Sequence, residues 1–221
     1  MTGGNVSFYN ETKNKKKTSN QQNDYQIDAI FPTPVIGMLG IIDDMDRCMS
    51  PEFKNIGEQI YVIGDNCCEI GGSEYLKIIH NVVLGDSPEI DLENEKKLIE
   101  LVLELIQDGV ITAAHDISEG GVALCLSEMA ILSDGLGCRI SIPELTCSFV
   151  FGETQCGIVV TVPNSNSNVL LNKCKNYGLG CHWLGDVTKD TFEIEGVVKT
   201  TYSNLKEVYE NGLKNALVED K

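Results

Sequence analysis

The sequence has little positive charge and few aromatic residues. It contains 17 lysines and arginines against 33 aspartates and glutamates, which gives a formal charge of −16, and aromatic residues make up 6% of the chain. Proteins bind nucleic acids and anionic membranes through cationic surfaces, so this balance argues against both classes of partner. With so few aromatic residues, we expect the core to be mostly aliphatic.

Long apolar runs and a leader pattern are also missing from the sequence. No run reaches the roughly 18 apolar residues that a membrane helix needs, and the N-terminus lacks the charged-then-apolar order of a secretory signal. We therefore expect a cytoplasmic protein with no membrane partner. Its 221 residues suffice for one domain, or for one domain and part of another.

Paired CxxC motifs are absent, and the nine cysteines are an odd number. Because Cys125 and Cys156 fall in core-like segments, we predict reduced, mostly buried thiols. Adjacent Cys67 and Cys68 leave a metal or redox pair open. Neighbouring cysteines chelate one ion poorly and no second ligand pair stands nearby, so a structural role is favoured.

The most informative stretch runs from Ala113 to Ala130. Val110–Ala114 is a short, apolar, partly β-branched run, which predicts a buried strand with His115 and Asp116 at its carboxyl end. The next residues predict a helix with Ser118 as its N-cap.

The predicted helix begins beside a negative charge and two glycines. Glu119 is expected in its first turn, and Leu124, Met129 and Leu132 are expected in the core.

Gly120 and Gly121 permit two interpretations. Glycine weakens a helix start by roughly 1 kcal/mol relative to alanine, so a bare backbone there implies a close approach by another group. That group is either a ligand anion at the helix N-terminus or the sheet on which the helix packs tightly.

Before this stretch, the composition divides the chain into two regions. We place a domain boundary at residue 50, giving domains 1–50 and 51–221. In the first, residues 13–24 read as a polar loop, and Val35–Ile42 is an apolar run that predicts a buried strand.

The second region reads as alternating strands and helices. Gln59–Gly64 predicts a strand, Gly71–Leu76 a short helix after a glycine pair, and Asp91–Ile106 a long amphipathic helix. In the turn before the strand at Cys156–Val162, Glu153 and Gln155 are positioned either to read a substrate hydroxyl or amide, or simply to form a polar turn.

Six segments, in chain order, resemble one protein family. GGNVSFYNET, PTPVIGMLGIIDD, GGSEYL, AAHDISEGGVALCLSEMA, FGETQ and LGDVTKDTFEI are similar to the C-terminal portion of phosphoribosylformylglycinamidine synthase. The resemblance implies an α/β (α+β) fold like the C-terminal domain of aminoimidazole ribonucleotide synthetase. This fold is a mixed sheet flanked by helices, preceded by a remnant of the ATP-handling domain.

The activity implied by this resemblance is an ATP-dependent ligation in purine biosynthesis. Formylglycinamide ribonucleotide, ATP and glutamine-derived ammonia would give formylglycinamidine ribonucleotide, ADP and phosphate. The implied cofactors are ATP or ADP and Mg²⁺. The family pattern makes Gly4 an ATP contact, Asn5 a magnesium ligand and Ser7 a substrate contact, and it assigns no catalytic residue to this chain.

The internal repeat of the family suggests a second, auxiliary ligand site. By that comparison Asp116 and the Glu153-Thr154-Gln155 turn resemble positions that bind metal and substrate in the first half. The ligand-site candidates are therefore Asp116, Glu153 and Gln155, together with the bare backbone of Gly120 and Gly121.

The resemblance also implies partners. The N-terminal half of the synthetase is not in this sequence, so we expect the chain to be inactive alone and to work with that half and with a glutaminase component. The alternative is a non-catalytic nucleotide-binding or scaffolding domain, or a degenerate remnant. An apolar face over residues 30–42 predicts self-association.

Overall fold

The computed structural model describes residues 11–15, 25–30, 33, 35–64, 69–142 and 146–219. The chain divides into two compact units, Met1–Asp43 and Asp44–Lys221. Among the described helices, none is both long and apolar enough to cross a membrane.

The first unit contains a two-stranded antiparallel sheet. Strand β1 (Glu11–Lys15) pairs with β2 (Tyr25–Ala29), with Glu11 opposite Ala29. The loop predicted for residues 13–24 is therefore wrong at residues 13–15, and residues 16–24 lie outside the described part.

The apolar run Val35–Ile42 is not the buried strand that its composition predicts. It has no helix or strand assignment, and Val35 and Leu39 are 93% and 101% exposed. The prediction fails because a strand needs a partner for its backbone N–H and C=O groups, and no described strand pairs with this segment.

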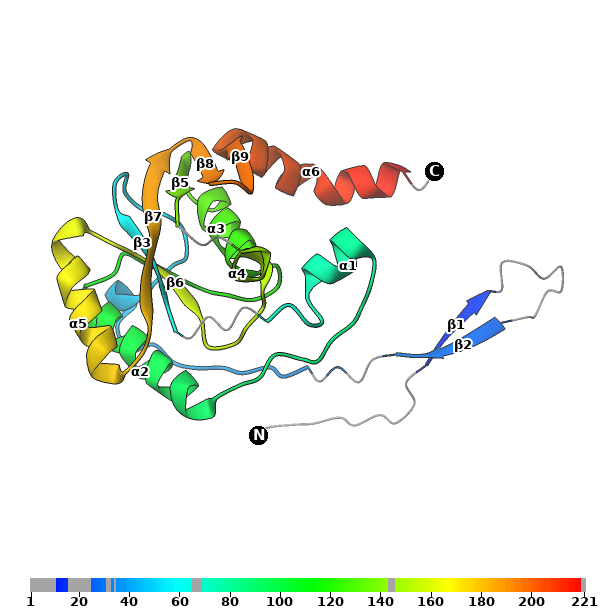
Figure 1. Ribbon diagram of the computed structural model, residues 1–221, viewed down its shortest axis with the longest axis horizontal. Coiled ribbons are helices and arrows are strands. Elements are labelled where there is room, and N and C mark those ends of the chain that lie inside the picture. The colour runs from blue at the N-terminus through cyan, green and yellow to red at the C-terminus, as the bar shows by residue number, and fades with distance from the viewer. Residues whose placement is uncertain are drawn as a thin grey trace. The chain divides into compact units, whose positions relative to one another are not determined.

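The second unit is built on a seven-stranded mixed sheet (Figure 1). Its order is β4-β6-β3-β7-β5-β8-β9, in which β5 and β8 are parallel and the other neighbours antiparallel. The strands are β3 (Gln59–Ile63), β4 (Ala113–Asp116), β5 (Leu136–Ile140), β6 (Ile158–Val162), β7 (Cys181–Lys189), β8 (Thr191–Ile194) and β9 (Val198–Thr201).

Helices flank both faces of this sheet, as the sequence predicts (Figure 1). The α-helices are α1 (Glu74–His80), α2 (Leu92–Gln107), α3 (Gly121–Ile131), α4 (Cys147–Phe151), α5 (Ser167–Tyr177) and α6 (Tyr202–Glu219), and short 3-10 turns form η1 (Met45–Arg47) and η2 (Asn164–Asn166). The predicted long helix is confirmed, with Asp91 as the N-cap of α2.

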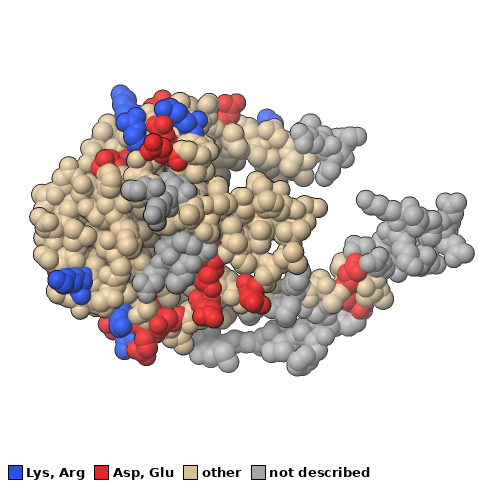
Figure 2. All heavy atoms as spheres, in the orientation of Figure 1, with Lys and Arg blue, Asp and Glu red and all other residues tan. Residues whose placement is uncertain are grey.

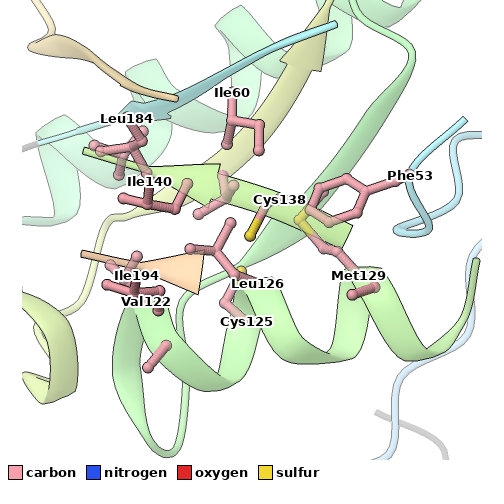
Figure 3. Close-up of a cluster of buried hydrophobic side chains, with 14 of the residues drawn as sticks. Phe53, Ile60, Val122, Cys125, Leu126, Met129, Cys138, Ile140, Leu184 and Ile194 are labelled. Carbon is pink, nitrogen blue, oxygen red and sulfur yellow. The ribbon is translucent and has the colours of Figure 1, made fainter. Parts of the chain in front are cut away.

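Strand β3 is buried on both sides and separates two cores. Because side chains alternate along a strand, Ile60 and Val62 enter the core with α3, whereas Tyr61 and Ile63 enter the core with α2 and α5. Figure 3 shows the first core, where Leu126 and Met129 of α3 point toward the sheet.

Two of the three apolar residues predicted for the α3 core are instead on its outer side. Met129 is fully buried, but Leu124 and Leu132 are 44% and 58% exposed. The buried face consists of residues at helical spacing, Val122, Cys125, Leu126, Met129 and Ala130, and this spacing turns Leu124 and Leu132 away from the sheet.

This arrangement predicts a large difference between two leucines of one helix. Leu126→Ala should lower the free energy of unfolding by roughly 2–5 kcal/mol, because it leaves a cavity in the core. Leu124→Ala removes the same atoms from a half-exposed position and should cost about 1 kcal/mol or less. Urea unfolding of both variants measures the difference, and equal losses would contradict the assigned helix face.

Candidate functional site

A single carboxylate joins the two glycine-rich turns of the second unit. Glu153 Oε1 accepts hydrogen bonds from the N–H of Gly120 at 2.8 Å and from the N–H of Glu74 at 2.8 Å. Gly120 is the first of the two glycines in the HDISEGG turn, and Glu74 is the first residue of α1, directly after Gly71-Gly72-Ser73. The acceptor for these backbone donors is thus supplied by the chain itself.

The turn before α3 differs from the predicted N-cap. Ser118 is not the cap and Glu119 is not in the first helical turn, because the helix starts at Gly121 with Gly120 as its N-cap in the left-handed conformation, at φ 81°. Ser118 takes part through its backbone, since its C=O accepts from the Gly121 N–H at 3.0 Å. Gly120 can adopt this backbone at no steric cost.

Gly121 is required by close packing. Its φ is 67°, and a Cβ placed on it would lie 2.7–2.8 Å from Val150 O, Phe151 C and Gly152 O. The sequence predicts that another group approaches this backbone closely, and at Gly121 that group is the end of α4. The packing interpretation is therefore right that the fold needs a bare backbone at Gly121, but the contact is with α4 and not with the sheet.

The end of β4 carries a partly buried histidine beside an exposed aspartate. His115 Nε2 lies 3.0 Å from Glu128 Oε2, and its Nδ1 lies 2.9 Å from the C=O of Asp116. The His115 side chain is 14% exposed and that of Asp116 is 74% exposed. Asp116 is therefore open to solvent, and it lines a 280 Å³ pocket together with His115 and Pro51.

The FGETQ turn is fixed against the segment that precedes α1. Glu153 donates its N–H to Glu69 C=O at 2.9 Å, and the Glu69 N–H donates to Thr154 Oγ1 at 2.8 Å. Thr154 is buried. The polar-turn interpretation of this segment is thus supported for Glu153 and Thr154, whose polar groups bind the chain's own backbone.

Gln155 differs from its neighbours because its side chain is exposed. It lines a 290 Å³ pocket together with Glu69, Glu89, Asp91 and Cys156. The Gln155 Nε2 group donates to the C=O of Glu153 at 3.3 Å, which leaves its Oε1 as an acceptor at the surface.

Neither cysteine close to these turns is a ready nucleophile. Burial raises the pKa of Cys156 to about 11, and the nearby Glu95 carboxylate adds to the increase. Burial likewise raises the pKa of Cys125, with the charges of Asp116 and Glu128 contributing. Since the thiolate is the reactive form of cysteine, these raised pKa values make both thiols weak nucleophiles.

The expected magnesium and ATP contacts cannot be placed. Gly4, Asn5 and Ser7 lie outside the described residues. Within the described ranges, no group of three or more His, Cys, Asp or Glu side chains is arranged to hold a metal ion.

Two contacts were missed by the sequence predictions. Glu153 is 33 positions from Gly120 and 79 positions from Glu74 in the sequence. The only sequence signal for these two hydrogen bonds is that a glycine pair precedes each of the two helices. The His115–Glu128 pair had no sequence signal, because a histidine and a glutamate at that separation are common.

The first comparison with known proteins concerns protein families. Residues 55–197 match the family described as AIR synthase related protein, C-terminal domain. The chain is 42% identical over 195 residues to the phosphoribosylformylglycinamidine synthase subunit PurL of Symbiobacterium thermophilum. This alignment covers 86% of the chain, and the chain spans 23% of that relative's length.

Solved structures show the same fold. PurL of Thermotoga maritima complexed with FGAR aligns with a TM-score of 0.59 at 17% identity, over 73% of this chain and 30% of that chain. Its complex with ADP aligns with a TM-score of 0.57 at 18% identity, over 73% of this chain and 27% of that chain. The predicted mixed sheet flanked by helices is therefore confirmed.

Replacing Gly121 should destabilise the fold in two ways, through its positive φ and through its close packing, and a second glycine allows the two to be measured separately. Gly121→Ala and Gly178→Ala both place alanine at a positive φ, 67° and 70°, but nothing lies within 4 Å of a Cβ at Gly178. Gly121→Ala should therefore destabilise the fold by about 1–3 kcal/mol more than Gly178→Ala. Thermal and urea unfolding measure both, and equal losses would contradict the close contact with α4.

Proposed function

The chain belongs to the AIR synthase related family, through the C-terminal domain in its residues 55–197, and on this premise we propose that it contributes to an ATP-dependent synthetase reaction. In this proposal formylglycinamide ribonucleotide, glutamine-derived ammonia and ATP give formylglycinamidine ribonucleotide, ADP and phosphate. The observation that supports it is the 42% identity to a PurL subunit over 195 residues. The motif-based resemblance to the C-terminal portion of that synthase is confirmed.

The proposal assigns only part of the activity to this chain. Because the chain spans 23% of its relative's length, we propose that the reaction also needs the remaining synthetase domains and a glutaminase component. Gly4, Asn5 and Ser7 would contribute the ATP contact, one magnesium ligand and the substrate contact. The exposed apolar residues of the first unit, such as Val35 and Leu39, are consistent with a further polypeptide or a second copy covering them.

The charge distribution is consistent with small-molecule and protein partners. On the face shown in Figure 2, lysines and arginines lie singly or in small groups among acidic side chains. With a formal charge of −16, the proposal includes no nucleic-acid partner and no membrane partner.

An assay of the chain with and without the rest of the synthetase tests this function. The purified 221-residue chain should not release ADP from ATP, ammonia and formylglycinamide ribonucleotide. It should do so when polypeptides supplying the other synthetase domains are added. Ser7→Ala should lower the restored rate at least about tenfold, a barrier increase of about 1.4 kcal/mol.

Ser203→Ala is the matched control for this assay, because Ser203 is an exposed residue of α6. Its rate should equal that of the unmodified chain. No activity in the combined system would contradict the proposed reaction. Full activity of the chain by itself would contradict the shared site.

The second candidate function is a non-catalytic nucleotide site in the second unit. It is favoured by one observation, the exposed Asp116 carboxylate beside a pocket at the end of β4. Here Asp116 and Gln155 would contact a nucleotide and its cation, while Gly120, Gly121 and Glu153 would shape the turn. Structures of Thermotoga maritima PurL complexed with ADP and with ATP support the choice of probe.

Calorimetric titration with magnesium-ADP distinguishes this second function. Asp116→Ala should weaken the binding at least about tenfold, or by about 1.4 kcal/mol. Asp134→Ala removes an exposed aspartate from the opposite end of α3 and should leave the binding unchanged. Binding that neither substitution alters would place the nucleotide elsewhere, and absence of binding would remove this candidate function.

A further inference from the structure

The last helix of the chain, α6, is anchored to the second unit at its beginning. Leu205 packs against the first core, and the Tyr202 hydroxyl donates to the C=O of Ser133 at 3.1 Å. In Figure 1 the rest of α6 continues past α3 and α4 toward the C-terminus. From Glu207 to Leu217, every residue of this helix except Asn211 is exposed.

The exposed part of α6 carries a continuous apolar stripe. Its members recur at the three- and four-residue spacing that places side chains on one side of a helix. They are Leu205, Val208, Tyr209, Gly212, Leu213 and Ala216. Beyond the anchored turn, Val208, Tyr209 and Leu213 are 73%, 66% and 76% exposed. Such a stripe is the surface through which a helix packs against a partner.

The distribution of charge favours a second copy of this chain as that partner. Each copy has a formal charge of −16, so two copies repel each other unless they meet at a surface without net charge. Among the described side chains of α6, two lysines balance two glutamates, namely Lys206, Lys214, Glu207 and Glu210. Two copies can therefore approach each other along this helix with little electrostatic repulsion.

We propose that two copies of the chain associate through the apolar stripes of their α6 helices, which lie antiparallel and cross at Gly212. A twofold axis at the crossing makes the interface self-complementary. Val208 of one copy is then level with Ala216 of the other, so that a larger side chain meets a smaller one. Tyr209 and Leu213 of the two copies alternate along one side of the contact.

The glycine in the middle of the stripe is explained by this crossing. Glycine weakens a helix interior, and no contact among the described residues requires it here, because a Cβ at Gly212 would meet nothing within 4 Å. The distance between two packed helices depends on the side chains at their contact. Gly212 and Ala216 would let the two backbones approach closely.

Sedimentation equilibrium of the unmodified chain and of Leu213→Glu tests the proposal. The unmodified chain should have the mass of a dimer at micromolar concentration, and dilution should lower this mass. Leu213→Glu would bury one carboxylate from each copy in the apolar contact, so it should raise the dissociation constant of the dimer at least about tenfold. Because Leu213 is exposed in the single chain, the variant should fold, which far-UV circular dichroism checks.

Two variants that make the same change elsewhere are the matched controls. Leu92, at the start of α2, is 71% exposed, and Leu39, in the first unit, is 101% exposed. Leu92→Glu and Leu39→Glu should leave the dissociation constant unchanged. Leu39→Glu also separates α6 from the apolar face over residues 30–42, for which the sequence predicts self-association. A dimer that is lost in Leu39→Glu and kept in Leu213→Glu would overturn the proposal.

Gly212→Leu is a second test, and it adds no charge. In the single chain a leucine at this position favours the helix and has open space around its Cβ, so the fold should be kept. In the proposed contact it would force the two helices apart and should raise the dissociation constant at least about tenfold.

Three results would overturn this interface. The first is an unmodified chain that stays monomeric at every concentration. The second is a dimer that either Leu213→Glu or Gly212→Leu leaves unchanged. The third is a monomer that needs Leu213 to bind polypeptides supplying the other synthetase domains, which would assign the stripe to those domains.

Discussion

The hydrogen bonds from Gly120 and Glu74 to one oxygen of Glu153 hold the second unit's glycine-rich turns together. A backbone N–H before or at a helix start has no partner within its own helix and must find an acceptor. Glycine pairs at such places are typical of phosphate sites. Here the negative charge comes from Glu153, a side chain of a third segment. Glycine pairs before helices, which are typical of a ligand site, therefore mark a contact within the fold in this protein. Any anion that used these donors would first have to replace Glu153.

The parts of the fold that the sequence predicts are those fixed by neighbours along the chain. Helix α2 has its Asp91 cap and its repeated apolar residues within one segment, and β3 has an apolar face on each side. Tertiary partners determine the rest. Ser118 is a good N-cap by composition, but the packing of Gly121 against α4 places the helix start after it. Val35–Ile42 has a strand-like composition, but no described strand is available to pair with it.

The sequence singles out the residues of these turns but not the contacts that each of them makes. Asp116 and Gln155 line two different pockets. Glu153 and Thr154, from the same motif, satisfy backbone groups of the chain itself. Residue type does not show whether a side chain lines a pocket or binds the chain's own backbone, because an acidic or hydroxyl side chain can do both. The role of each side chain depends on partners that are 33–85 positions away in sequence. These partners come together only when the sheet forms. Family membership therefore identifies the domain, while the geometry shows which of its motif residues bind the chain's own backbone.

Amide hydrogen exchange at Gly120 and Glu74, compared between the unmodified chain and Glu153→Ala, tests the central claim of this account most directly. If Glu153 is the shared acceptor, both amides should lose protection together in the variant, while amides of β3 keep theirs, because both donors lose the same partner. Glu153→Gln, which retains a side-chain oxygen, should preserve part of the protection. Unchanged exchange at both amides in Glu153→Ala, or a loss at only one, would contradict a carboxylate that joins the two turns.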